Sequence, residues 1–116
     1  MDGLTIHEAS ETTGWSARML RYIEQSGLVT PGRTGSGYRI YGAAELQRLR
    51  TLKELLGRFD VALSDVAFSA RLDSDAALRA AIHEWLSATA ERPDEVQPDD
   101  WLRFEQAKHE RLLQAA

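Results

Sequence analysis

The sequence predicts a mainly helical fold: a winged helix-turn-helix of four short helices and a two-stranded wing, with a short two-helix tail. Three observations lead to this prediction. Two short helices are expected, one before and one after a tight turn at Gly14. A glycine-rich hairpin follows them. Leucines at helical spacing then mark a longer amphipathic helix.

The first two helices are predicted from the residues that cap them. Thr5-Ile6-His7-Glu8 has the form of a capping box, so a first helix should continue to about Thr13. Gly14 interrupts the helical pattern, and Ser16 is a good N-cap for a second helix that should extend to Ser26. Two short helices joined by a glycine-containing turn form a helix-turn-helix.

The second helix is expected to have a buried side and an exposed polar side. Leu20 and Ile23, with Met19 beside them, lie on one side, and Gly27 follows the helix where a left-handed C-cap residue belongs. The other side carries polar side chains at i, i+3, i+4 and i+7, namely Arg18, Arg21, Tyr22 and Gln25. This spacing places two arginines and a tyrosine on one helix surface.

A β-hairpin is expected after the second helix. Residues 28–33 and 37–41 form two short extended runs around the flexible tip Thr34-Gly35-Ser36. Strand alternation places Tyr38 and Ile40 on one face of the hairpin. Arg39 and Tyr41 then lie on the other.

Four further helical segments complete the prediction. The leucine spacing over residues 43–58 predicts an amphipathic helix with its cations outward, at Arg48, Arg50 and Lys53. Ser64 is expected to cap a fourth helix, and Asp73 or Ser74 to cap a fifth that extends to about Thr89. Residues 91–98 are predicted to form an acidic linker with two prolines. A last helix is expected to begin at Asp99 and Asp100. We therefore expect a winged helix-turn-helix domain over residues 1–72 and a helical tail over residues 73–116.

The composition and motifs exclude several kinds of functional site and a membrane-spanning segment. The 116 residues contain no cysteine, which excludes disulfides, thiolate zinc sites and thiol redox sensing. No apolar run is long enough to span a membrane, and the start of the chain, with Asp2, lacks a signal pattern, so the expected location is the cytoplasm. No two of the three histidines have metal-ligand spacing, and no catalytic motif is present. We expect no metal, no cofactor and no enzymatic activity.

The charge is distributed unevenly along the chain. The formal net charge is −4, but residues 15–58 contain eight Arg or Lys and three Glu, a local charge of about +5. Both flanking segments are acidic. Because the local field matters more than the total, this basic segment favours contact with phosphate on one face.

The residues of the second helix and the hairpin carry a family resemblance. Residues 14–28 read Gly-Trp-Ser-Ala-Arg-Met-Leu-Arg-Tyr-Ile-Glu-Gln-Ser-Gly-Leu, and Pro31, Arg33 and Gly37-Tyr38-Arg39-Ile40-Tyr41 follow. They closely resemble the MerR family of bacterial transcription regulators, in which S-x-R-x-L-R-Y-Y-x-x-x-G-L leads into a wing ending G-Y-R-x-Y. The resemblance covers about Leu4 to Leu72 and departs from the family at Ile23 and Trp15.

The resemblance implies binding to promoter DNA with distortion of the duplex. The residues expected to contact DNA lie on the second helix and the wing: Ser16, Arg18, Arg21, Tyr22, Arg33, Tyr38 and Arg39. Core packing is an alternative role for Tyr22 and Tyr38. Ile23 is expected to face inward. Trp15 is expected to plug the core, with base stacking as its alternative.

The tail departs most from the family, whose members typically dimerise through a long helix and add a sensor domain. Here prolines interrupt the helix after about 15 residues. The tail carries four large apolar side chains, Trp85, Trp101, Leu102 and Phe104. They are expected either to build a dimer interface or to close a small core within the chain.

The function expected from the sequence is that of a sequence-specific DNA-binding transcriptional regulator. Its expected partner is double-stranded DNA, bound by a homodimer or by monomers arrayed on adjacent sites, and contact with RNA polymerase is left open. Two alternatives stay open. One is an architectural or excisionase-like DNA-binding protein, and the other is a protein-interaction adaptor that uses its acidic helical tail.

Overall fold

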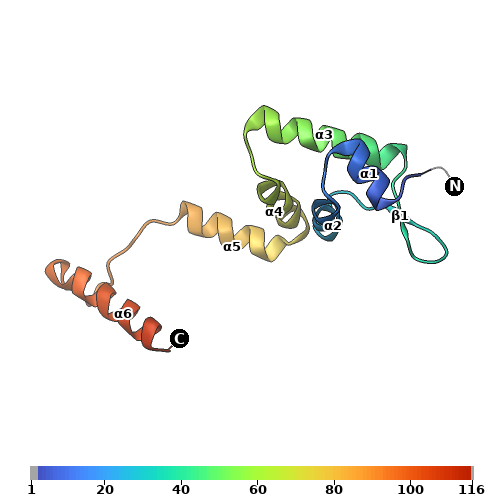
Figure 1. Cartoon of the computed structure of the whole chain (residues 1–116). Coiled ribbons are helices and arrows are strands. Elements are labelled where there is room, and N and C mark those ends of the chain that lie inside the picture. Colours follow the sequence, from blue (N-terminus) through green and yellow to red (C-terminus); the bar gives the residue numbers. More distant parts are fainter. Residues whose placement is uncertain (1–2, 116) are drawn as a thin grey trace. The chain divides into compact units, whose positions relative to one another are not determined.

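The computed structural model describes residues 3–115. The chain forms two compact units, one ending at Ala81 and the other beginning at Ile82 (Figure 1). The predicted domain limits at residues 1 and 116 lie outside the described residues. The elements, in order, are α1 (Ile6–Thr13), α2 (Ala17–Gln25), β1 (Gly32–Arg33), β2 (Arg39–Ile40), α3 (Ala43–Phe59), α4 (Leu63–Ser74), α5 (Ala76–Ser87), the 3-10 helix η1 (Pro98–Asp100) and α6 (Trp101–Ala115). The predicted fold class, mainly helical with a two-stranded antiparallel wing, is confirmed.

The helix-turn-helix forms as its caps predict. The Thr5 hydroxyl accepts a hydrogen bond from the Glu8 backbone N–H at 3.2 Å, and the Glu8 carboxylate accepts one from the Thr5 N–H at 3.0 Å. The hydrogen bond that the Thr5 backbone N–H donates to the carboxylate, with a smaller contribution from the Thr5 hydroxyl, lowers the pKa of Glu8, because it stabilises the charged form. Gly14 ends α1 with φ of 81°, a left-handed conformation that disfavours a side chain, and Gly27 follows α2 with φ of 75°.

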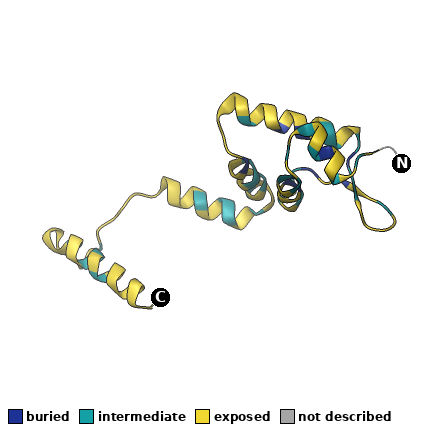
Figure 2. Cartoon of the chain, in the orientation of Figure 1, coloured by how far each residue is buried: buried dark blue, intermediate teal, exposed yellow. Residues whose placement is uncertain are grey.

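One hydrophobic core holds the first unit together (Figure 2). Helices α1, α2 and α3 and the end of the hairpin all contribute to it. Its most deeply buried side chains are Ala9, Leu20, Ile23, Tyr41 and Leu49, each at most 1% exposed. Ile23, at the position where the family has a second tyrosine, faces inward as predicted.

The wing is shorter than the two runs in the sequence. Only Gly32–Arg33 and Arg39–Ile40 pair, with Gly32 opposite Ile40 and Arg33 opposite Arg39. The expectation that residue 28 begins a strand is wrong: Val29 is instead buried in the core beside Leu28. At the tip, the Gly37 N–H donates to the Thr34 carbonyl at 2.9 Å and closes the turn.

Two predicted helix caps are wrong by one or two residues. Ala62, rather than Ser64, is the N-cap of α4, because the Asp65 carboxylate accepts a hydrogen bond from the Ala62 N–H at 2.8 Å. Asp75, rather than Asp73 or Ser74, caps α5, since its carboxylate accepts a hydrogen bond from the Leu78 N–H at 3.0 Å.

The second unit contains the end of α5, the linker, η1 and α6. Val96, in the linker, is 8% exposed, and Arg92 donates a hydrogen bond to its carbonyl. The Trp101 indole N–H donates to the Glu105 carboxylate at 3.2 Å within α6. Across residues 3–115, no helix combines the length and apolarity that crossing a membrane requires.

The Tyr41 hydroxyl is expected to contribute nothing to stability. It is buried and makes no hydrogen bond to residues 3–115, and burial raises the pKa of this phenol. Replacing Tyr41 with Phe removes a buried polar group that costs about 1–3 kcal/mol when unsatisfied. We expect the free energy of unfolding of Tyr41→Phe, measured by urea titration, to equal or exceed that of the wild type. The control Leu49→Ala should lose about 2–5 kcal/mol, and a loss above about 1 kcal/mol in Tyr41→Phe would contradict the prediction.

Candidate nucleic-acid interface

The exposed face of α2 carries three of the seven predicted DNA-contacting residues, and its N-cap Ser16 is a fourth. Leu20 and Ile23 are each 1% exposed and anchor one side of the helix in the core. The helical repeat then turns the opposite side to solvent. Arg18, Arg21 and Gln25 are exposed there, and Tyr22 is 37% exposed, so Tyr22 is not a core residue.

Ser16 determines where this face begins. It is in an extended conformation, and its hydroxyl accepts a hydrogen bond from the Met19 N–H at 3.1 Å. Ser16 is exposed, while Met19 packs against the core. The same hydroxyl therefore caps α2 and lies at the end of the helix that carries Arg18.

The Arg18 and Arg21 guanidinium groups have no partner among residues 3–115. Neither makes a salt bridge or hydrogen bond there, in contrast to the arginines of the wing. An unpaired, exposed guanidinium retains all five of its N–H donors. Arg18 and Arg21 are therefore available to contact phosphate or the edge of a guanine base.

The wing is bound to α2 by a single carboxylate. Glu24, on α2, accepts a hydrogen bond from Arg33 Nη2 through Oε2 at 2.6 Å and one from Arg39 Nε through Oε1 at 2.6 Å. Arg33 also donates from Nη1 to the Gly37 carbonyl at 3.2 Å, across the hairpin. These bonds place both predicted wing arginines beside α2.

The electrostatics of this cluster favour ionised Glu24. Burial beneath the wing alone would raise its pKa, but the hydrogen bonds and positive charges of Arg39 and Arg33 outweigh burial and hold the pKa below its ordinary value. In the sequence, Glu24 is only one of three acidic residues in the basic segment of residues 15–58. Its partners lie 9 and 15 residues away, so no helical or strand periodicity points to the pairing.

The tip of the wing presents an aromatic side chain to solvent. Tyr38 is 74% exposed, so core packing, the alternative role for it, does not apply. Its backbone N–H donates to the Thr34 hydroxyl at 3.0 Å, and Gly37, with φ of 87°, precedes it. The phenol thus extends from an ordered turn.

Trp15, in the turn after α1, and two cations of α3 pack against the core or bond to the backbone. Trp15 packs against the core and donates from Nε1 to the Leu49 carbonyl at 3.2 Å, in agreement with the predicted plug. Lys53 Nζ lies 5.1 Å from the centroid of the Trp15 ring and donates to the Thr13 carbonyl at 2.7 Å. Arg48 donates to the Leu28 carbonyl at 3.1 Å. Two cations expected simply to face outward therefore hold loops in place.

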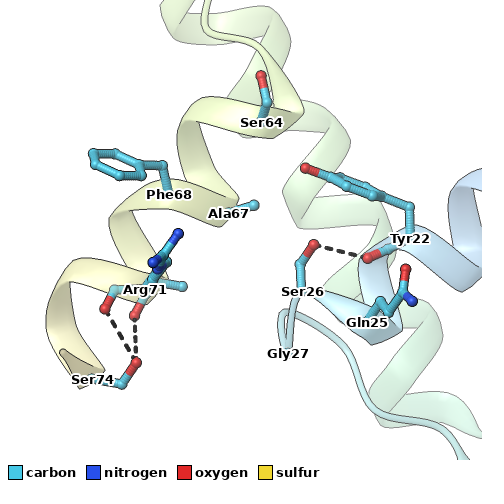
Figure 3. A pocket seen from close by; sticks show the side chains of 10 residues that line it. Tyr22, Gln25, Ser26, Gly27, Ser64, Ala67, Phe68, Arg71 and Ser74 are labelled. Carbon is cyan, nitrogen blue, oxygen red and sulfur yellow. Dashed lines mark hydrogen bonds between the residues drawn. The ribbon is translucent and has the colours of Figure 1, made fainter. Parts of the chain in front are cut away.

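An open groove of about 620 Å³ lies along the C-terminal half of α2 (Figure 3). Tyr22, Gln25 and Ser26 line one side of it. The other side is lined by residues of α4, among them Ala67, Phe68 and Arg71. The exposed face of α2 is thus bordered by α4 along this groove and by the wing through Glu24.

A comparison with protein families finds one match over the first unit. The family described as "MerR HTH family regulatory protein" matches residues 4–67, more than half of the 116 residues. The matched segment includes α2, the wing, α3 and the start of α4.

Similar curated proteins are bacterial regulators. The chain is 43% identical over 54 residues to the HTH-type transcriptional regulator HmrR of Rhizobium leguminosarum bv. viciae, covering 47% of this chain and 42% of that protein. It is 47% identical over 51 residues to heavy metal-dependent transcription regulator 2 of Rhizobium meliloti (strain 1021), covering 43% of this chain and 35% of that protein. The match thus spans less than half the length of these relatives.

A solved structure shares the fold. It is the crystal structure of HiNmlR, described as a MerR family regulator lacking the sensor domain, bound to promoter DNA. The TM-score is 0.51 at 22% sequence identity, and the likeness covers 97% of this chain and 83% of that chain. At this identity the likeness supports the fold of the described chain.

Glu24 should make stability depend on pH. Because its pKa is lower in the folded chain than in the unfolded chain, its contribution to stability is present above the unfolded glutamate pKa of about 4.3. That contribution is lost as the pH falls through the lower, folded pKa. We expect the difference in unfolding free energy between wild type and Glu24→Gln to be largest near pH 7 and to shrink below about pH 4. Denaturant titrations at a series of pH values measure it. A difference that stays constant with pH would contradict the prediction.

Proposed function

The chain belongs to the MerR family of regulatory proteins, and on that basis we propose that it is a sequence-specific DNA-binding transcriptional regulator that acts at promoter DNA. One observation carries the proposal. The exposed face of α2 offers two unpaired arginines, Arg18 and Arg21, beside a wing whose own arginines are bound to the same helix.

The proposed recognition element is α2. An α-helix fits the major groove of B-form DNA, where arginine reads guanine through two hydrogen bonds. Its buried side is anchored by Leu20 and Ile23, so the reading face cannot rotate freely. We assign Arg18 and Arg21 to base or phosphate contact, and Ser16 and Tyr22 to neighbouring contacts from their hydroxyl groups.

The proposed role of the wing is to grip the DNA backbone beside the groove. Tyr38 is exposed at its tip, and Arg33 and Arg39 keep part of their guanidinium surface accessible, with side chains 44% and 27% exposed. A wing that holds the backbone while α2 lies in the groove supports distortion of the duplex. Phosphate contacts of this kind position a protein on DNA without reading its sequence.

We propose that two copies act together on DNA, because a single small module binds weakly. Large apolar side chains suited to pairing are exposed in α5, where Trp85 is 77% and Leu86 is 66% exposed. Further ones are exposed in α6, at Leu102, Leu112 and Leu113. A dimer and monomers arrayed on adjacent sites are both compatible with these surfaces, and the acidic tail could also contact RNA polymerase.

The proposal includes no metal and no catalytic step. Some relatives are named as heavy metal-dependent regulators. The donor set of this chain does not fit such a site, because it has no cysteine and residues 3–115 hold no group of three or more His, Asp or Glu arranged to bind a metal ion. As a regulator of bacterial promoter DNA, the chain is proposed to work in the cytoplasm.

Selection from random duplex DNA tests the proposal and its stoichiometry. We expect the purified chain at moderate salt to enrich one family of sequences. An enriched palindrome indicates a dimer, because operator symmetry mirrors protein symmetry. A single short site indicates arrayed monomers. If no sequence is enriched, the regulator proposal fails, and the architectural and adaptor alternatives become the better accounts.

The two unpaired arginines should account for much of the affinity. We expect Arg18→Ala/Arg21→Ala to weaken binding to the enriched duplex roughly 10- to 1000-fold and to reduce the slope of log affinity against log salt by up to about 2. Its thermal midpoint should stay near that of wild type, because both side chains are exposed. Fluorescence anisotropy across a salt series measures the affinities.

The matched control is Arg103→Ala/Arg111→Ala, which removes two exposed cations from α6. This variant should bind DNA as the wild type does. Equal losses in the two variants would show that total charge, rather than the face of α2, governs binding.

A further inference from the structure

A single carboxylate, that of Glu24, binds both arginines of the wing. Glu24 Oε1 and Oε2 each accept one hydrogen bond of 2.6 Å, from Arg39 and Arg33 respectively. The Glu24 side chain is 17% exposed, so the pairing is partly shielded from water and salt. It is much closer than the other ion pair of the basic segment, Arg50–Glu54, which measures 3.8 Å.

Glu24 does not neutralise the charge of the two arginines. One negative charge faces two positive charges, which leaves a formal charge of about +1 at the junction of α2 and the wing. Arg39 uses only Nε toward Glu24, and its two terminal nitrogens make no hydrogen bond within residues 3–115. Positively charged donors therefore remain at the junction, held in a fixed direction.

From this geometry we propose that Glu24 is a specificity-determining residue, which fixes the wing arginines against the recognition helix and weakens their attraction to DNA of arbitrary sequence. This inference rests on the proposed DNA-binding function. Glu24 itself contacts no base in the proposal; it acts by positioning Arg33 and Arg39.

Two physical effects of Glu24 raise specificity together. As an anion, it competes with phosphate for the same guanidinium donors, which lowers affinity for every duplex. As a tether, it holds the arginines where they can meet the backbone only when α2 is seated in the groove. On the matching sequence the arginines are already in place, so less side-chain entropy is lost there on binding.

Removing the charge should therefore affect matched and unmatched DNA differently. In Glu24→Gln the amide replaces one acceptor oxygen with a donor that Arg33 and Arg39 cannot use. One arginine then loses its acceptor and the other keeps only a weaker, neutral hydrogen bond, so both follow the backbone of an arbitrary duplex more easily. Affinity for unmatched DNA rises because the local positive charge increases by one, whereas the advantage of preorganisation on matched DNA is lost.

The test compares Glu24→Gln with Glu54→Gln, which makes the same charge change at an exposed pair within the same basic segment. Each variant is titrated, over a salt series, with the duplex enriched by the wild type and with a shuffled duplex of the same composition. For Glu24→Gln we expect tighter binding to the shuffled duplex, a salt slope steeper by about 1, and a matched-to-shuffled affinity ratio that falls about tenfold. Glu54→Gln should keep the wild-type ratio. Equal shifts on both duplexes in both variants would overturn the inference.

A second variant separates position from charge. Glu24→Asp keeps the negative charge but is one methylene shorter, so it cannot reach both arginines in their present positions. We expect its affinity ratio to fall without tighter binding to the shuffled duplex. An unchanged ratio in Glu24→Asp would show that Glu24 acts by charge alone and would overturn the positioning role.

Amide hydrogen exchange of the free proteins provides a readout that needs no DNA. We expect residues 34–38 to exchange faster in Glu24→Gln than in wild type, with little change in α1 and α3, since the wing loses its tether. Unchanged exchange would overturn the inference even if the chain binds DNA as proposed. Conversely, failure of the wild type to distinguish the two duplexes would count against the proposed function and would leave the tether measured by exchange intact.

Discussion

Burial of one side of α2 is the constraint on which the rest of the first unit depends. Leu20 and Ile23 must enter the core that Leu49 completes, and a helix of nine residues can then present only its opposite face to solvent. That face carries Arg18 and Arg21. The hydrophobic effect thus fixes the direction of the polar groups, and the glycines and caps around α2 fix its ends.

Electrostatic contacts extend this rigidity to the wing. A two-residue strand pair is marginal by itself, but Glu24 couples the hairpin to α2 through two short charge-assisted hydrogen bonds. Two further cations of the basic segment are also structural, because Arg48 and Lys53 donate to backbone carbonyls. The charge excess seen in the sequence therefore divides into cations that hold the unit together and cations that remain available for a partner.

Much of the first unit could be predicted from local sequence, because caps, turns and helical periodicity act over three or four residues. The capping box at Thr5, the cap at Ser16 and the inward position of Ile23 are examples. The cap of α4 was wrong by two residues, since Asp65 and the neighbouring serine are both good acceptors. The Glu24 pairing could not be predicted, because it joins residues 9 and 15 positions apart through the tertiary fold. The family resemblance placed both wing arginines on DNA without showing that α2 already holds them.

The most direct test of the account is a map of the DNA-contacting residues on the intact chain. Amide resonances of isotope-labelled protein would be followed by NMR as the duplex enriched by selection is added. We expect the largest shifts within residues 16–25 and 33–39, with small shifts over residues 101–115. Shifts concentrated in residues 101–115, with α2 and the wing unaffected, would contradict it and would indicate that the tail, rather than the helix-turn-helix, is the binding surface.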